Sequence, residues 1–276
     1  MTVRRTGLRF ELLLFLLAAA FFALGYARPG GGPGPFEPGP RAAGVLRVLT
    51  WNVGQSDGSL AADDVMHVAT VIRQLEPDLC FLQEVANTRQ IQKLLRDLGP
   101  EWTHSSKRER GGSQLAVLAR GGWLVSFHVP AARAVAHGVR LRTSNGRTVS
   151  AIGLHADTFS SRKRNEQIGS AVEFLSRRHP DTAKIVAGDL NLDLDLDKRR
   201  DLFSDDSYLD VETYNFVADR LVDTAQGRGS TAEPDRRLDY IFASPAHFEV
   251  VAAGPVAGQR RGAMDHDPVV ADLRFR

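Results

Sequence analysis

Three segments in the C-terminal half of the chain place polar side chains at the ends of apolar runs. They are Gly188-Asp189-Leu190-Asn191, Leu238-Asp239-Tyr240-Ile241-Phe242 and Asp265-His266-Asp267-Pro268. The ends of buried strands present such groups on a rigid scaffold, where reaction chemistry is usually found. Carboxylate, amide and imidazole groups brought together there can hold a hard divalent cation, position a water molecule and stabilise a phosphoryl oxyanion.

Three further polar residues follow apolar runs nearer the N-terminus. Asn52 offers a neutral oxygen ligand or a hydrogen-bond donor to phosphate, and Glu84 offers a carboxylate. A carboxylate suits Mg²⁺, which takes one or two protein carboxylates and keeps several waters. His155 follows the run over residues 149–154. Taken alone, each has an ordinary interpretation as a turn former, a surface residue or a structural histidine.

Spacing relates the C-terminal residues in pairs. Asp189 and Asn191 lie two apart, so on an extended backbone both side chains point the same way. Asp239 and His266 form an acid–imidazole pair if the fold brings them together. A carboxylate on one ring nitrogen fixes the histidine tautomer and supports the imidazolium.

The elements that would position these residues alternate between strands and helices. The predicted strands are residues 45–51, 79–83, 114–119, 149–154, 183–187, 238–243, 248–253 and 269–275. Residues 61–75 and 161–178 show apolar side chains at helical spacing, and a proline follows each. Strands grouped without strict alternation predict an α/β fold with two packed sheets flanked by helices.

Composition places the chain among globular proteins. It has 276 residues, of which 43% are hydrophobic and 25% charged, with a net charge of +2. Residues 1–44 hold five arginines against two glutamates, which leaves −1 for the remainder. The body therefore lacks the basic footprint of a tight nonspecific DNA binder. Basic clusters such as Arg236-Arg237 are predicted to be solvated loops. Cys80, the single cysteine, is predicted to be buried in the core.

The first 44 residues are predicted to be a leader followed by a linker. Arg4, Arg5 and Arg9 precede an apolar stretch over residues 10–27. This pattern predicts that residues 1–27 are a signal peptide or an uncleaved signal-anchor transmembrane segment. The Pro/Gly-rich residues 28–44 are predicted to be a linker. We therefore expect an extracytoplasmic protein, either secreted or anchored to the membrane.

Alternating aspartates over residues 193–197 resemble a calcium-binding loop only superficially. An EF-hand loop needs glycine at its sixth position, where this chain has Lys198. We predict a solvated turn or the start of a helix here.

The six segments that carry these polar residues, taken in their order along the chain, resemble the endonuclease/exonuclease/phosphatase superfamily. The resemblance covers residues 45–276 and is strongest to its deoxyribonuclease/sphingomyelinase-like branch. It implies a catalytic domain with a four-layer α/β sandwich, in which helices flank two packed mixed β-sheets. It also implies Mg²⁺-dependent cleavage of a phosphate ester, with Mn²⁺ or Ca²⁺ as alternative ions.

The resemblance implies that metal is held by Glu84, as the principal carboxylate, together with Asn52 and Asp265. The implied catalytic residues are His155, Asp189, Asn191, Asp239 and His266. In this scheme Asp189 orients or deprotonates the attacking water, and Asn191 assists at the phosphate. His266 acts at the scissile phosphate and is held by Asp239. His155 protonates the leaving oxygen or stabilises the pentacoordinate charge.

Three positions bear on the choice of branch. Glu109 is a candidate for the glutamate that orients His155 in the deoxyribonuclease branch. Gly54 stands where apurinic endonucleases carry an aspartate, which argues against a repair enzyme. Met264 replaces the small residue usual before Asp-His.

These features predict an exported Mg²⁺-dependent phosphodiesterase acting as a nuclease. The alternatives are a sphingomyelinase-like enzyme acting on phospholipid head groups, and a small-molecule phosphatase. A non-catalytic binding domain is disfavoured because Glu84, Asp189, Asn191 and His266 are all retained. The expected partners are nucleic acid or a phospholipid head group, and the membrane if the leader is uncleaved. We expect a monomer.

Overall fold

The computed structural model describes residues 36–55, 58–109, 111–130, 132, 135–195 and 208–276. The predicted leader, residues 1–27, lies outside these residues, as does most of the predicted linker. Within the described ranges, no helix has the length and apolar character needed to cross a membrane.

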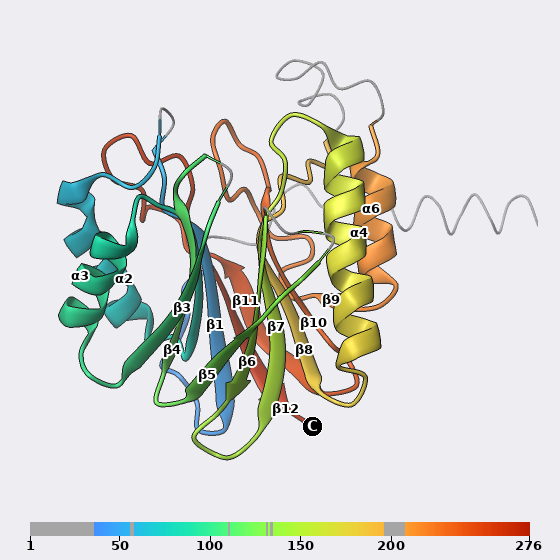
Figure 1. Ribbon diagram of the computed structural model, residues 1–276, viewed down its shortest axis with the longest axis horizontal. Coiled ribbons are helices and arrows are strands. Elements are labelled where there is room, and N and C mark those ends of the chain that lie inside the picture. The colour runs from blue at the N-terminus through green and yellow to red at the C-terminus, as the bar shows by residue number, and fades with distance from the viewer. Residues whose placement is uncertain (1–35, 56–57, 110, 131, 133–134, 196–207) are drawn as a thin grey trace, which may run out of the picture. The chain divides into compact units, whose positions relative to one another are not determined.

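Two mixed β-sheets make up the centre of the described chain (Figure 1). The first has the strand order β11-β12-β1-β2-β4-β3, and the second has the order β5-β6-β7-β8-β10-β9. The strands of the first are β1 Val45–Asn52, β2 Leu79–Val85, β3 Trp102–Arg108, β4 Gln114–Arg120, β11 Phe248–Pro255 and β12 Val269–Phe275. Those of the second are β5 Trp123–Phe127, β6 Ala136–Arg142, β7 Thr148–His155, β8 Ala183–Asp189, β9 Val222–Asp223 and β10 Asp239–Ala243.

Each sheet has one parallel strand pair near its centre. β1 and β2 are parallel and are joined through a short 3-10 helix, η1 (Ala62–Asp64), and α2 (Val65–Leu75). β7 and β8 are parallel and are joined through α4 (Ser161–Arg178). Because parallel neighbours end on the same side, each pair brings two strand ends to one edge of its sheet.

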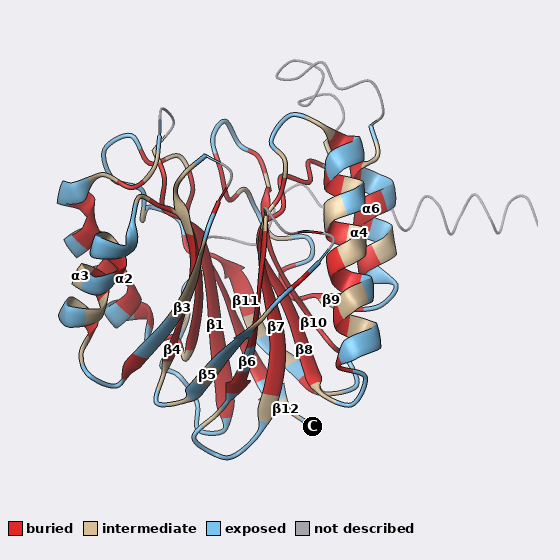
Figure 2. Ribbon diagram, in the orientation of Figure 1, coloured by how far each residue is buried: buried red, intermediate tan, exposed pale blue. Residues whose placement is uncertain are grey.

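The layers pack through three apolar clusters. The first joins the first sheet to α2 and to α3 (Thr88–Leu98), and the third joins the second sheet to α4 and to α6 (Asp210–Ala218). The middle cluster lies between the two sheets and includes Val48, Phe81, Ala151, Ile185 and Ile241. The central strands are almost wholly buried (Figure 2). The predicted four-layer α/β sandwich is therefore confirmed.

Two of the strands missed by the sequence analysis, β3 and β5, lie at the edges of their sheets. β3 is mostly polar, with Trp102 as its one buried residue, whereas β5 is rich in apolar residues although none of them is fully buried. β6 contains Gly138, which leaves room for the ring of Phe127. α3 does carry a helical signal, because Ile91, Leu94 and Leu98 are buried on one face.

The end of the predicted linker lies along the domain. Phe36 packs against the first apolar cluster, close to Gly254. The carbonyl oxygen of Gly39 accepts a hydrogen bond from the guanidinium of Arg47 at 2.8 Å. These contacts fix residues just before β1 against the sheet.

Candidate active site

The polar strand ends predicted from the sequence meet at one edge of the sandwich. β1, β2, β7 and β8 end at this edge, and β10 begins there because it runs antiparallel to β8. A cavity of about 410 Å³ opens among these ends. Seven predicted site residues line it: Asn52, Glu84, His155, Asp189, Asn191, Asp265 and His266.

Strand alternation aims most of these side chains between the sheets. Asn52 has the same parity on β1 as Val48, and Asp189 has the same parity on β8 as Ile185. Both apolar residues belong to the cluster between the sheets. Asp239 follows the same rule on β10. Every second residue of a strand faces one side, so the inner face ends in polar groups at the edge.

Regular strand alternation does not explain why the Glu84 side chain points into the cavity. Regular alternation after Phe81 would turn Gln83 inward and Glu84 toward the helices. The register between β2 and β4 shifts between Leu82 and Val85, and Glu84 has a φ of 60°. A bulge of this kind redirects a side chain, and such backbone strain concentrates at functional sites. A Cβ at Gly54 would collide with the Glu84 side chain, so the absence of a side chain there makes room for the carboxylate.

Asn52 links the two sheets through its amide. Its Nδ2 donates to Glu84 Oε1 and to Asp189 Oδ2, both at 3.1 Å. Its Oδ1 accepts from the N–H of Gly54 at 3.0 Å. Asn52 therefore acts as a donor that holds two carboxylates together. Its predicted role as a metal ligand stays a prediction.

The relation predicted between Asp189 and Asn191 is wrong in its geometry. Asn191 lies beyond the end of β8 and has a φ of 50°, so the strand alternation assumed for the pair does not reach it. Instead, the N–H of Asn191 donates to Asp189 Oδ1 at 2.9 Å, and its Nδ2 donates to the carbonyl of Ala156 at 3.1 Å. Both residues still line the same cavity. The tight turn, rather than strand alternation, places the asparagine there.

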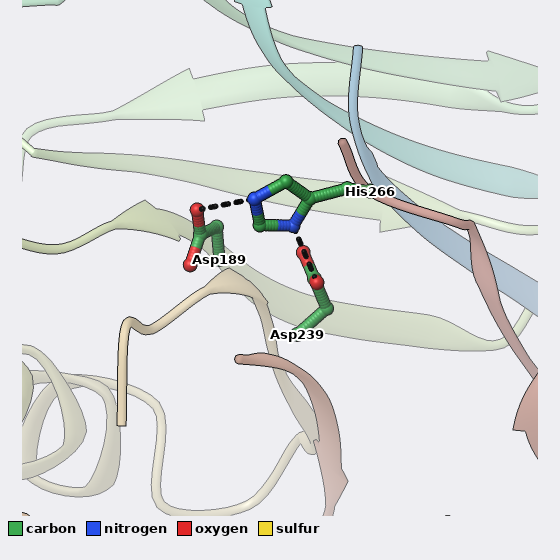
Figure 3. Close-up of side chains that lie close together, drawn as sticks. All are labelled: Asp189, Asp239 and His266. Atoms are coloured by element: carbon green, nitrogen blue, oxygen red, sulfur yellow. Dashed lines mark hydrogen bonds and ion pairs between the residues drawn. The ribbon is translucent and has the colours of Figure 1, made fainter. Parts of the chain in front are cut away.

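His266 is held between two aspartates (Figure 3). Its Nδ1 lies 2.8 Å from Asp239 Oδ2, and its Nε2 lies 3.9 Å from Asp189 Oδ2. The indole N–H of Trp51 donates to the His266 carbonyl at 3.0 Å, which fixes the backbone. Burial lowers the pKa of His266, but the charge and hydrogen bond of Asp239, with Asp189 and Asp265, outweigh it and raise the pKa to about 10. The aspartates therefore favour the protonated form of the ring, whose Nε2 lies on the side of Asp189.

His155 has an equivalent arrangement on the other side of Asp189. Its Nδ1 lies 2.9 Å from Glu109 Oε1, and its Nε2 lies 3.8 Å from Asp189 Oδ2. Burial lowers the pKa of His155, but Glu109 and the carboxylates of Asp189 and Glu84 raise it to about 9. Glu109 is itself held, because the hydroxyl of Ser113 donates to its Oε2 at 2.5 Å. The structure thus places the glutamate suspected from the sequence directly on this histidine.

The donor set fits a hard divalent cation. Glu84, Asp189 and Asp265 bring three carboxylates to one cavity. Burial, opposed by His155 and Asn52, raises the pKa of the Glu84 carboxyl. A cation beside it would offset this destabilised charge, and carboxylate and amide oxygens are the ligands that Mg²⁺ accepts. Asp189, Asp239 and His266 also lie within ligand distance of one another, at 4.8 Å or less. In that group, however, His266 Nδ1 is already bonded to Asp239.

Two stretches that were predicted to be solvated contain buried charges. Arg236 is 6% exposed and Asp193 is 2% exposed, so the prediction is wrong for these two residues, whereas Leu194 is exposed. Arg236 Nε donates to Asp193 Oδ2 at 2.9 Å. Arg236 and Glu233 also line the cavity, and sequence reasoning gave neither a role there. The remaining part of the predicted turn, from residue 196, lies outside the described residues.

Comparison with known proteins agrees with this geometry. The endonuclease/exonuclease/phosphatase family matches residues 49–260. The chain belongs to this family. Its members are enzymes that hydrolyse phosphate esters and use divalent metal ions, so the chain is a metal-dependent phosphoester hydrolase. The narrower deoxyribonuclease/sphingomyelinase-like branch stays a prediction.

Solved structures of the same fold share little sequence with the chain. The human Nocturnin catalytic domain is 20% identical, with a TM-score of 0.64, covering 84% of this chain and 94% of that one. The mannosyl-6-phosphatase of Bacteroides thetaiotaomicron is 18% identical, with a TM-score of 0.61, covering 83% and 99%. TDP2 of D. rerio is 15% identical, with a TM-score of 0.64, covering 83% and 98%. No curated protein matches the sequence.

Glu109 is expected to act through His155 by orienting its ring. Glu109→Gln keeps the shape of the side chain and removes its charge. We expect it to lower kcat on a phosphodiester by at least about tenfold with little change in KM, because the imidazolium loses its carboxylate partner. Steady-state kinetics with Glu101→Gln, an exposed glutamate outside the cavity, provide the control. In a His155→Ala background, Glu109→Gln should leave kcat almost unchanged. Equal kcat for the two glutamine variants would refute this role.

Proposed function

We propose that the chain is an exported, Mg²⁺-dependent phosphodiesterase that acts as a nuclease. One observation carries the proposal: the Asp189 carboxylate lies between two imidazole Nε2 atoms, at 3.8 Å from His155 and 3.9 Å from His266. A base, an acid and a donor to phosphoryl oxygen are the groups that in-line hydrolysis of a diester needs.

Each of these residues has its own role in the proposed reaction. Asp189 orients a water molecule and takes its proton as the oxygen–phosphorus bond forms. His266 donates a hydrogen bond to a non-bridging oxygen and stabilises the added charge. His155 gives its proton to the leaving oxygen as the second oxygen–phosphorus bond breaks. Glu84, Asn52 and Asp265 would hold Mg²⁺, which polarises the phosphoryl oxygens when bound.

The charge of the cavity favours a diester over a monoester. Among the described residues that line it, Arg236 is the single arginine or lysine, and it is paired with Asp193. A phosphate monoester brings nearly two negative charges, which calls for more cationic partners than a singly charged diester does. The two imidazoles, His155 and His266, supply the remaining positive charge, and the proposed reaction already uses them at the leaving oxygen and at one non-bridging oxygen. A singly charged phosphodiester is therefore the substrate we expect, rather than a small phosphomonoester.

Removal of either central group is expected to abolish hydrolysis. The full-length protein with Mg²⁺ should nick supercoiled plasmid DNA, and His266→Ala or Asp189→Asn should slow this by at least about 100-fold. Circular dichroism should show both variants folded. His104→Ala, an exposed histidine on β3, should retain activity.

The same assay separates the candidate substrates. Activity within a few-fold of wild type in both His266→Ala and Asp189→Asn would refute the assignment of these residues to the active site. Hydrolysis of sphingomyelin vesicles without plasmid nicking would transfer the proposal to phospholipid head groups. Turnover of sugar phosphates alone would make the protein a small-molecule phosphatase.

Metal removal is expected to abolish activity reversibly. Excess chelator should stop hydrolysis, and added Mg²⁺ should restore it. Mn²⁺ and Ca²⁺ are added in separate reactions to compare the activity that each ion restores. Mg²⁺ should also raise the melting temperature of the wild type, because it binds the folded state, and should do so much less in Glu84→Gln. Full activity in excess chelator, or an equal thermal shift in the variant, would contradict the metal role of Glu84.

Export rests on residues 1–27 alone. Their basic and apolar pattern supports a position outside the cytoplasm, in secreted or anchored form. Cell fractionation tests this part of the proposal, and recovery of the protein solely in the cytoplasm would overturn it.

A further inference from the structure

A second cavity continues the reactive one past His155. It has a volume of about 630 Å³ and shares Gly58, Glu84, His155 and Thr158 with the reactive cavity. Its size lies within the roughly 300–1,000 Å³ typical of ligand sites. A substrate held at the catalytic groups can therefore extend into this space.

An aromatic ring lines the second cavity and remains open to solvent. Phe159, in the loop between β7 and α4, is 72% exposed. Single exposed apolar residues are ordinary on protein surfaces. Trp123 on β5 is one such residue, because it is 62% exposed and lines neither cavity. The position of Phe159 beside a reactive histidine is what sets it apart.

The loop that carries Phe159 is held firmly. Asp157 Oδ1 accepts the N–H groups of Phe159 and Ser160 at 3.1 and 2.9 Å, and Gln167 Oε1 accepts the N–H of Asp157 at 2.9 Å. The fully buried guanidinium of Arg164 donates to the carbonyls of Asp157 and Thr158. A loop backbone fixed in this way loses little conformational entropy when a flat group stacks on the ring that it carries.

Three carboxylates line the described part of this cavity, and the one on Glu84 is assigned above to the metal. The Asp157 carboxylate is engaged by the loop amides and lies 3.4 Å from Lys163 Nζ. Glu109 is engaged by His155 and Ser113. Lys163 is half-exposed at the rim and offers its ammonium to a flanking phosphate. An aromatic face with a neighbouring cation matches a nucleotide, whose base stacks while its phosphate contacts the lysine.

We propose that the second cavity binds the nucleobase next to the scissile phosphate by stacking it on Phe159, so that the preferred substrate is an unpaired nucleic acid strand. This step rests on the nuclease function proposed above. The bases of a duplex have their faces covered by their neighbours. A base is free to stack on protein only in a single strand or at an opened end.

A thermodynamic cycle between the ring and the base tests the inference. The full-length protein carrying Asp189→Asn, which prevents cleavage, is titrated with a fluorescent single-stranded oligonucleotide and with one that has abasic linkers. Phe159→Ala should weaken binding of the normal strand by about tenfold and of the abasic strand by much less. Phe159→Trp should restore affinity, and Trp123→Ala should leave it unchanged.

Several outcomes would overturn the inference. One is an equal loss for normal and abasic strands, and another is a Phe159→Ala effect no larger than that of Trp123→Ala. A third is weakened binding to sphingomyelin vesicles with unchanged binding to the strand, which would assign the ring to lipid. The cycle measures binding, so it is independent of whether wild type cleaves plasmid. Wild-type cleavage combined with a failed cycle would leave the nuclease function standing and remove the stacking site.

Discussion

The site depends on one constraint, which is that every second side chain of a central strand faces the opposing sheet. Along β1, β8 and β10 the inward positions are mostly apolar and fill the space between the sheets. At the edge, the next inward position is Asn52, Asp189 or Asp239. A slip of one residue would turn all the inward side chains of a strand to its other face. The packing that stabilises the core therefore also fixes where the reactive groups point.

This alternation explains how much the sequence could reveal. The buried strands and their polar ends are visible as runs of apolar residues that stop at Asn, Asp or His, and these predictions agree with the fold. Glu84 and Asn191 were found as residue types, but their directions could not be predicted. Each depends on a left-handed backbone at a residue other than glycine. No local sequence pattern predicts such a conformation, because the surrounding structure imposes it.

Long-range ion pairs mark a second limit of sequence reasoning. Arg236 and Asp193 lie 43 residues apart, and each stands in a stretch of charged residues that looks solvated. Burying either charge alone would be costly, so both can be buried only because the fold brings them together. The fold also joins Glu109 and His155, which lie 46 residues apart, and only the family resemblance suggested that pair. Buried ion pairs between distant residues were therefore the part of the site that local sequence patterns could not reveal.

Strands and loops contribute differently to the site. The groups that face the scissile phosphate belong mainly to strand ends, where the core fixes them. The space beyond His155 is lined in part by the loop before α4, which the buried guanidinium of Arg164 ties to the helix layer through Asp210. If Phe159 stacks on a base as proposed, a change in the exposed part of this loop is expected to alter what the cavity accepts without moving Asp189 or His266. Substrate preference and phosphate chemistry can then vary separately, because the loop and the strand ends are held by different contacts.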